Sequence, residues 1–342
     1  MQTVFVGLSG GVDSAVSAYL LKKQGYEVIG AFIKGWEPHF LSCTGTEDRL
    51  SAMQVAAHLN IPFIAYDLEE EYKSRIVDYF VNEYKKGRTP NPDVMCNRII
   101  KFGEFWRRTQ ADGADAIATG HYAENMRTDS AFDLLVSKDT EKDQTYFLWT
   151  LTQEDLSHTL FPIGSMTKSE VRKLAEKIGL PNAKRKDSQG LCFLGHVDMA
   201  EFLKRYIPAQ SGIVRDESGT EIGKHSGVWF YTIGQRRGFS VPSSEPYYVV
   251  GKDIEKNEII ASKIPSGEHP KKEYAFAETN WISGTAPKGG LFVRYRYRQP
   301  LLPASFENDK IVFETPQLIA PGQSLVFYDA DKRRCVGGAV AL

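Results

Sequence analysis

The sequence predicts an α/β protein that ends in small β domains, and three observations lead to this fold class. Up to about residue 190, short apolar runs alternate with helical patterns, which is typical of a mostly parallel sheet covered by helices on both faces. From about residue 210, short β-rich runs are separated by Gly, Pro and Asp turns, which is typical of barrel-like β domains. The length of 342 residues is enough for two or three domains.

The elements of the first part follow from the apolar pattern. Strands are expected at residues 3–8, 27–33, 62–68 and 115–120. Helices are expected at residues 14–23, 47–59, 70–86 and 99–110. A further helix begins after Thr167, because Thr167 and Glu170 have the spacing of a capping box, and Gly179 followed by Pro181 ends it.

The β-rich part contains one basic aromatic run, RYRYRQ at residues 294–299. If this run continues a strand, its three arginines line one face and its two tyrosines the other. Arginine rows suit RNA phosphates, and tyrosine suits stacking on bases or packing in a core. The alternative is an ordinary barrel strand with a solvated arginine face.

Composition excludes several classes of protein. With 42% hydrophobic and 25% charged residues, the chain reads as a soluble globular protein, and no apolar run approaches the roughly 20 residues that span a bilayer. The four cysteines are scattered without a C-x-x-C pair, which argues against structural zinc or a disulfide scaffold. We expect a cytoplasmic protein without a signal peptide or membrane contact. Its net charge of -1 leaves nucleic-acid binding to local basic clusters.

The segment SGGVDS, residues 9–14, lies between a short strand and a helix start. Backbone N–H groups and the dipole at a helix start bind anions, and Gly10 and Gly11 let the backbone approach phosphate oxygens. It is not a Walker A loop, because the first lysine, Lys22, lies eight residues beyond Ser14, and its glycine spacing differs from the dinucleotide fingerprint. It resembles the loop of the PP-loop ATP pyrophosphatases, which implies ATP binding, pyrophosphate release and transfer of AMP to a substrate oxygen. The alternative is a tight turn that binds nothing.

A second distinctive segment is GRTPNPDVMCNRIIKF, residues 87–102. Its two prolines hold the residues before them in extended conformations. Cys96 follows Asp93 by three residues and is expected near a helix start, where a thiol has a lowered pKa, with positive charge from Arg98 and Lys101 nearby. The alternative is a buried, inert cysteine.

The second cysteine of interest is Cys192, in the Gly-flanked polar segment KRKDSQGLCFLG, residues 184–195. Two cysteines in separate loops of a domain with an adenylation loop suggest sulfur transfer. ATP would activate an oxygen of the acceptor, a persulfide on one cysteine would deliver sulfur, and the second thiolate would attack the persulfide or close a disulfide afterwards. We expect Cys43 to be incidental and Cys335 to belong to the core.

Seven segments occur in the same order as in the bacterial tRNA-specific 2-thiouridylases of the PP-loop superfamily, and the chain resembles that family over nearly its whole length. The segments are SGGVDS (9–14), TPNPDxxCN (89–97), ATGHY (118–122), KDQTYFL (142–148), KDSxGxCF (186–193), TIGQRxG (232–238) and RYRQ (296–299). The resemblance implies a PP-loop α/β catalytic domain (adenine nucleotide alpha hydrolase-like) at residues 1–198. A small β-rich central domain at 199–268 and a C-terminal, tRNA-contacting β-barrel at 269–342 would follow.

The same resemblance assigns roles to individual residues. Cys96 would be the nucleophile, Cys192 the persulfide carrier, and Asp93 an acid/base group that serves either the uracil or a thiol. The implied ATP-binding residues are Gly7, Leu8, Ser9, Gly10, Gly11, Val12, Asp13, Ser14, Ile33 and Gly120. The implied contacts with the target base are Asn91, Pro92 and Asp93, and those with tRNA are His121, Lys142, Asp143, Gln144, Arg296, Tyr297 and Gln323. Ile33 stands where the family often has methionine, and it keeps an apolar surface there.

The implied reaction is ATP-dependent transfer of sulfur to C2 of the wobble uridine, position 34 of tRNA, giving 2-thiouridine, AMP and pyrophosphate. It would use ATP with Mg²⁺, no tightly bound metal or cluster, and a cysteine desulfurase with a sulfur-relay carrier as partners. Three other classes stay open. Other PP-loop synthetases and 4-thiouridine synthases also adenylate, but do not need this cysteine arrangement with the later segments. A nucleotide-sensing RNA-binding protein has no use for both cysteines and Asp93, and an iron–sulfur thiolase needs cysteines at cluster spacing.

Overall fold

The first part of the chain forms the expected parallel sheet in our computed structural model, which describes residues 1–342 except 42–43, 188–191, 194, 196, 266, 268–269, 288 and 308. The strand order is β3-β2-β1-β4-β7, and every pairing is parallel. The strands are β1 (Thr3–Gly7), β2 (Glu27–Lys34), β3 (Phe63–Asp67), β4 (Ala116–Ala118) and β7 (Thr159–Leu160). The four expected strands are therefore confirmed, and the two-residue β7 is an addition.

Helices cover both faces of this sheet, as the alternating pattern predicts. In β1, Val4 and Val6 face a core shared with α1 (Val12–Lys23), α2 (Gly45–Leu59) and α8 (Lys168–Lys177). Phe5 points to the opposite face, into a core shared with the remaining long helical segments. These are α3 (Glu69–Tyr72), η1 (Lys73–Val77) and α4 (Asp78–Lys85), then α5 (Pro92–Cys96), η2 (Asn97–Glu104) and α6 (Phe105–Ala111). The capping box of Thr167 and Glu170 at the start of α8 is confirmed.

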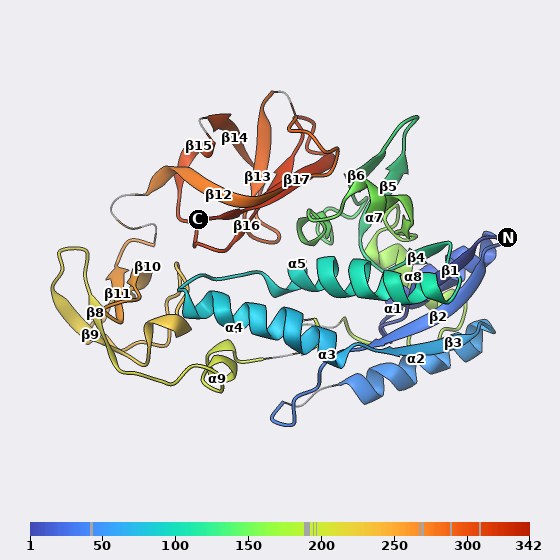
Figure 1. Ribbon diagram of the computed structural model, residues 1–342, viewed down its shortest axis with the longest axis horizontal. Coiled ribbons are helices and arrows are strands. Elements are labelled where there is room, and N and C mark those ends of the chain that lie inside the picture. The colour runs from blue at the N-terminus through green and yellow to red at the C-terminus, as the bar shows by residue number, and fades with distance from the viewer. Residues whose placement is uncertain are drawn as a thin grey trace.

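The central part of the chain forms a small sheet of order β10-β11-β8-β9. Its elements are α9 (Met199–Leu203), β8 (Gly212–Arg215), β9 (Glu221–His225), η4 (Val228–Phe230), β10 (Tyr248–Asp253) and β11 (Glu258–Ser262). Figure 1 shows this unit at the far end of α4 from the parallel sheet, and the segment that joins α4 to α5 starts at that end.

The last part of the chain forms an antiparallel barrel of order β12-β15-β14-β13-β16-β17, closed by pairing of β12 with β17. The strands are β12 (Lys271–Trp281), β13 (Leu291–Arg294), β14 (Leu302–Glu307), β15 (Lys310–Gln317), β16 (Ser324–Tyr328) and β17 (Arg334–Ala341). Cys335 in β17 is 1% exposed, so the expectation that it belongs to the core is confirmed. The expectation of barrel-like β structure after residue 210 is also confirmed.

A hairpin of the first part joins this barrel. Its strands β5 (Ala123–Arg127) and β6 (Phe132–Val136) follow β4, and β6 pairs with β17 (Figure 1). Short segments η3 (Thr145–Phe147) and α7 (Gln153–Ser157) then lead back to the parallel sheet. The barrel is thus fixed to the α/β unit by backbone hydrogen bonds. Among the described residues, the helices are all too short or too polar to cross a membrane.

Candidate active site

The glycine loop leads from β1 into α1 in a conformation that glycine permits. Gly10 has φ +76°, and a Cβ there would lie 2.5 Å from the carbonyl oxygen of Asp48. The Gly10 carbonyl accepts hydrogen bonds from Ser51, Asn182 and Arg185 at 2.9, 2.9 and 3.2 Å. Because these three hydrogen bonds hold the Gly10 carbonyl, the loop keeps a fixed backbone conformation.

The hydroxyl groups of Ser9 and Ser14 are hydrogen-bonded to each other within the glycine loop. Ser14 Oγ lies 3.3 Å from Ser9 Oγ and donates to the carbonyl of Gly11 at 3.2 Å. Gly120, which follows β4, packs directly on this helix start, because a Cβ at Gly120 would lie 2.6 Å from Ser14 N. The loop and Gly120 therefore meet at the carboxyl ends of β1 and β4, where open α/β sheets bind their ligands.

The structure adds a lysine to a loop whose sequence has none. Lys168 Nζ, at the first position of α8, donates to both carboxylate oxygens of Asp13 at 2.7 and 2.8 Å, and Tyr122 donates its hydroxyl to Asp13 at 2.9 Å. Lys168 also pairs with Asp187 at 2.8 Å. Sequence reasoning missed this residue, and the signal available was its position directly after the N-cap Thr167.

Asp187 forms ion pairs with three cationic side chains beside the glycine loop. It pairs with Lys142 at 3.0 Å and Arg172 at 2.6 Å in addition to Lys168. Partial burial opposes ionisation, but the hydrogen bonds from Lys168 and Lys142 outweigh it and lower the pKa of Asp187. The result is a concentration of positive charge next to backbone amides, which suits a polyphosphate.

Asn91 and Pro92 begin the helix that carries Cys96. Asn91 is extended, with φ -103° and ψ 101°, and its side chain accepts from the N–H groups of Asp93 and Val94 at 3.2 and 3.3 Å. Pro92 occupies the first helical position, where its missing N–H costs nothing.

The side chains of Cys96 and Cys192 lie side by side. Their sulfur atoms lie 3.1 Å apart, with the Cys96 thiol donating to Cys192. The backbone of Cys192 is held on both sides, since its N–H donates to Asp93 Oδ1 at 3.1 Å and its carbonyl accepts from the Tyr72 hydroxyl at 2.7 Å. Of the neighbouring segment, residues 188–191, 194 and 196 lie outside the described part of the chain, as does Cys43.

The prediction of a low-pKa thiol at a helix start was wrong for Cys96. The helix begins four residues earlier, at Pro92, and Cys96 is completely buried. Burial raises the pKa of the Cys96 thiol, and the hydrogen bond to Cys192 raises it further. The Cys192 thiol shifts the other way, because the hydrogen bond from Cys96 and, against burial, the charge of Lys101 lower its pKa.

The segment before Asn91 is hydrogen-bonded to both β-rich units. Thr89 donates its N–H to the carbonyl of Pro321 at 2.7 Å, and its own carbonyl accepts from Gln323 Nε2 at 2.8 Å. Its hydroxyl donates to Thr232 at 3.3 Å. Gln323, which is predicted to contact tRNA, therefore also fixes the backbone of the segment that leads to Cys96.

The segment 142–148 links the two halves of the site. Lys142 pairs with Asp187 at the phosphate loop, Gln144 Oε1 accepts from the N–H of Tyr122 at 2.9 Å, and the Phe147 carbonyl accepts from Asn97 beside Cys96 at 3.0 Å. The glycine loop and the cysteine pair are thus connected to opposite ends of one short segment.

Three residues predicted to contact tRNA or ATP are buried in this structure. His121 is 7% exposed and hydrogen-bonded to Thr119 at 2.7 Å, and burial together with the charge of Lys101 lowers its pKa. Asp143 is 2% exposed and accepts from Thr145 at 2.8 Å. Ile33 is buried in β2. Their contacts with tRNA and ATP stay predictions.

The predicted arginine row on one strand face was wrong. Strand β13 ends at Arg294, because Gln299 Oε1 accepts the N–H groups of Tyr295 and Arg296 and closes a turn. Arg294 turns inward to Asp143 at 3.5 Å. Arg296 and Arg298 are exposed, with their guanidinium carbons 5.6 and 5.2 Å from the ring centres of Tyr295 and Tyr297.

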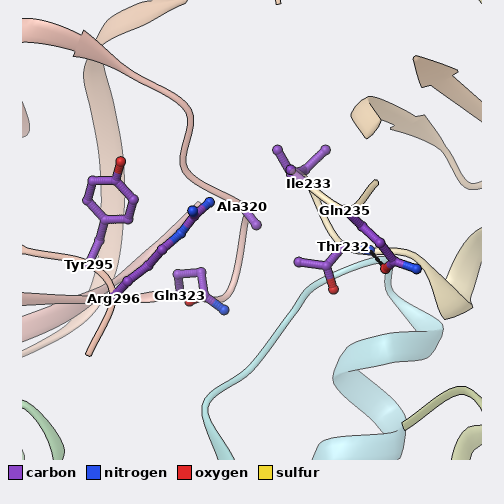
Figure 2. A pocket seen from close by; sticks show the side chains of 8 residues that line it. Thr232, Ile233, Gln235, Tyr295, Arg296, Ala320 and Gln323 are labelled. Atoms are coloured by element: carbon purple, nitrogen blue, oxygen red, sulfur yellow. Dashed lines mark hydrogen bonds between the residues drawn. The ribbon is translucent and has the colours of Figure 1, made fainter. Parts of the chain in front are cut away.

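An open pocket of about 200 Å³ lies between the barrel and the central unit. Figure 2 shows Arg296, Tyr295 and Gln323 on the barrel side, facing Thr232 and Gln235 of the central unit. The full lining is Thr232, Ile233, Gly234, Gln235, Tyr295, Arg296, Ala320 and Gln323. The segment TIGQ, which the sequence singled out by resemblance, thus forms one wall of the pocket.

A parallel-sheet domain with a glycine loop after its first strand, joined to β-rich units that hold Thr89 in the segment leading to Cys96, defines a PP-loop type of α/β protein. Three family models match the chain, described as tRNA methyl transferase HUP domain (residues 2–196), tRNA methyl transferase PRC-barrel domain (200–263) and aminomethyltransferase beta-barrel domain (271–341).

Curated relatives place the chain more closely. The tRNA-specific 2-thiouridylase MnmA of Geobacillus thermodenitrificans is 44% identical over 347 residues, which cover 98% of this chain and 93% of that protein. The protein of the same name from Nitrosomonas europaea is 45% identical over 357 residues, covering 99% and 98%. The chain belongs to the tRNA-specific 2-thiouridylase family.

Proposed function

We propose that this chain uses ATP to replace the C2 oxygen of the wobble uridine of tRNA by sulfur that is carried as a persulfide on Cys192. The observation that carries the proposal is the pair of sulfur atoms 3.1 Å apart, in the same domain as the phosphate loop. The names of the relatives support tRNA thiolation. Two of the family descriptions mention methyl transfer, but a methyl transfer has no step that needs this pair of cysteines.

The first step is adenylation. The uracil C2 oxygen attacks the α-phosphorus of ATP, a P–O bond forms, the bond between the α- and β-phosphates breaks, and pyrophosphate leaves. The amides of residues 7–14, with Lys168, would hold the departing phosphates, and Ile33 and Gly120 would border the adenosine. Mg²⁺ would bind the phosphate oxygens with Asp13, because hard cations prefer carboxylate and phosphate oxygens.

The second step is sulfur transfer. The outer sulfur of the Cys192 persulfide attacks C2, the C2–S bond forms and AMP leaves with the C2 oxygen. The Cys96 thiolate then attacks the inner sulfur, which breaks the persulfide S–S bond, leaves its electron pair on the sulfur at C2 and forms a disulfide between Cys96 and Cys192. A thiol reductant restores the two cysteines. Asp93, which binds the backbone of Cys192 and is half-buried, is placed to serve as acid/base group.

The tRNA is proposed to lie across the pocket between barrel and central unit, with its target base near Asn91, Pro92 and Asp93. Arg296, Tyr297 and Gln323 would contact the RNA there, and His121, Lys142, Asp143 and Gln144 would do so nearer the phosphate loop. We further propose that a cysteine desulfurase and a sulfur-relay carrier load Cys192, and that the protein works in the cytoplasm.

The test is nucleoside mass spectrometry of tRNA that lacks wobble thiolation, after incubation with the protein, ATP, Mg²⁺ and a desulfurase system. We expect 2-thiouridine at position 34 with the wild type and none with Cys96→Ser or Cys192→Ser, while Cys335→Ser should retain activity. Thiolation that survives loss of Cys192 would overturn the proposal.

A further inference from the structure

The residue that follows Cys192 has a strained backbone. Phe193 has φ +65°, which lies in the left-handed region, and a bulky side chain is rarely found there. Such a conformation persists only where the surrounding structure holds it, and residues of this kind gather at functional sites. The neighbours of Cys192 and Phe193 must therefore hold them in place.

Tyr72, the last residue of α3, contacts both of these residues. Its hydroxyl donates to the Cys192 carbonyl at 2.7 Å, across 120 positions of the chain. Its ring meets the Phe193 ring edge to face, with ring centres 5.6 Å apart and an angle of 82° between the planes. Tyr72 is 1% exposed, and burial raises the pKa of its hydroxyl, which keeps the proton that it donates. One side chain fixed in the core thus restrains the Cys192 peptide and the Phe193 ring together.

Gly35, directly after β2, supports Phe193 from another side. A Cβ at Gly35 would lie 2.7 Å from both Cβ and Cγ of Phe193, so the Phe193 side chain lies directly on the Gly35 backbone. Asp93 in α5 accepts the N–H of Cys192 at 3.1 Å. Contacts from β2, α3 and α5 therefore converge on two consecutive residues, the first of which carries the sulfur atom 3.1 Å from that of Cys96.

We propose that Tyr72 is a positioning residue of the proposed sulfur transfer, which holds Cys192 and the strained Phe193 so that the sulfur of Cys192 stays beside the sulfur of Cys96. The inference rests on the proposed function for its purpose, but its measurement does not. Attack of Cys96 on the inner sulfur of a Cys192 persulfide is fast only if the two sulfurs are kept within reach of each other. Without the Tyr72 hydroxyl, the strained backbone can relax and carry the Cys192 sulfur away from Cys96.

Thiol–disulfide exchange with glutathione measures how well the protein holds the two sulfurs together. Oxidised glutathione loses its S–S bond and becomes two glutathione thiols, while Cys96 and Cys192 give up two protons and two electrons and form a disulfide. The equilibrium constant of this exchange is the effective concentration of one protein thiol at the other. It is larger when the reduced protein already holds both sulfurs in place. The exchange uses neither ATP, tRNA nor a sulfur donor.

The experiment equilibrates the protein in glutathione buffers of set ratio, stops the exchange with acid and determines the Cys96–Cys192 disulfide by peptide mass spectrometry. Tyr72→Phe should lower the effective concentration about tenfold, because it removes the hydroxyl and leaves the ring. Gly35→Ala should also lower it, because the added methyl displaces Phe193. Tyr274→Phe is the matched control, since the Tyr274 hydroxyl donates to the Gln317 carbonyl at 2.6 Å in the barrel, and it should leave the effective concentration unchanged.

Thermal melts of the reduced proteins establish that the variants are folded, and Tyr72→Phe decides the question if Gly35→Ala unfolds. The wild-type effective concentration in folded Tyr72→Phe or Gly35→Ala overturns the proposal, as does an equal fall in Tyr274→Phe. If the wild type makes no 2-thiouridine but Tyr72→Phe lowers the effective concentration, the proposed function fails and the positioning by Tyr72 stands. If the wild type makes 2-thiouridine and Tyr72→Phe changes nothing, the proposed function stands and Tyr72 has no positioning role.

Discussion

The sulfur atoms of Cys96 and Cys192 lie 3.1 Å apart, although 96 residues separate them in the chain. Cys96 is fixed by the helix that begins at Pro92, and Cys192 by Asp93 and Tyr72. Both sulfurs can therefore act on the same substrate atom or on each other without rearrangement of the backbone.

Mild oxidation should join the pair. Treating the protein with one equivalent of a thiol oxidant is expected to form a disulfide between Cys96 and Cys192, because two thiols at this distance react with each other before either finds another partner. Non-reducing peptide mapping measures it. Cys335, which is 1% exposed in the barrel, is the internal control and should stay reduced. A main product that links other cysteines would contradict this geometry.

Lys168→Met should disable the ATP half-reaction. The change removes the ammonium group from Asp13 and Asp187, and we expect pyrophosphate release to fall about 10²- to 10³-fold, in line with loss of one preorganised electrostatic contact. A coupled pyrophosphate assay measures the rate.

Lys173→Met is the matched control, since Lys173 lies exposed on the same helix α8. It should keep the wild-type rate. Equal rates for Lys168→Met and the wild type would remove Lys168 from the phosphate site.

Gly120→Ala should damage the same site by a different route. The added methyl would lie 2.6 Å from Ser14 N and 2.8 Å from the carbonyl carbon of Asp13, so α1 must shift. We expect a loss of about 1–3 kcal/mol in the free energy of unfolding, typical of overpacking, and weaker ATP binding. Urea unfolding and calorimetric titration with ATP measure the two effects. Gly290→Ala, where a Cβ has open space, should change neither; unaltered ATP affinity in Gly120→Ala would show that the contact does not shape the site.

The parts of this site that are built from contiguous residues could be predicted from the sequence. The run SGGVDS predicts a phosphate-binding loop from six residues, because a strand, a glycine turn and a helix start are local features. The contact of Lys168 with Asp13 could not be predicted in that way, because the two residues lie 155 positions apart in the chain. In the sequence, Lys168 is an ordinary first residue of a helix.

The errors have physical causes that the sequence pattern does not show. RYRYRQ alternates like a strand, but the side chain of Gln299 ends the strand by capping two N–H groups, and side-chain hydrogen bonds of this kind leave the pattern unchanged. The hairpin of β5 and β6 was missed because its support comes from β17, about 200 residues later, where Leu134 pairs with Cys335.

Arg296→Ala should weaken tRNA binding and leave ATP binding unchanged. Arg296 is exposed at the pocket between barrel and central unit, and removing it should cost about 1–3 kcal/mol if it contacts a base, or flatten the salt dependence if it contacts phosphate. Filter binding of tRNA at several salt concentrations measures this.

Lys310→Ala is the control for the charge change, because Lys310 pairs with Glu273 on barrel strands β15 and β12 and does not line the pocket. Identical tRNA affinity of Arg296→Ala and wild type at every salt concentration would exclude Arg296 from the RNA surface. Loss of ATP affinity as well would indicate a structural role.

The most direct test of the account is a single turnover with labelled sulfur. The protein is loaded with ³⁵S by a desulfurase system, freed of donor, and mixed with ATP, Mg²⁺ and tRNA that lacks wobble thiolation. Before mixing, the label should map to Cys192; afterwards it should appear in 2-thiouridine at position 34, with an equal amount of disulfide between Cys96 and Cys192. Label that maps to Cys96 before mixing, or that remains on the protein when ATP and tRNA are present, would contradict it.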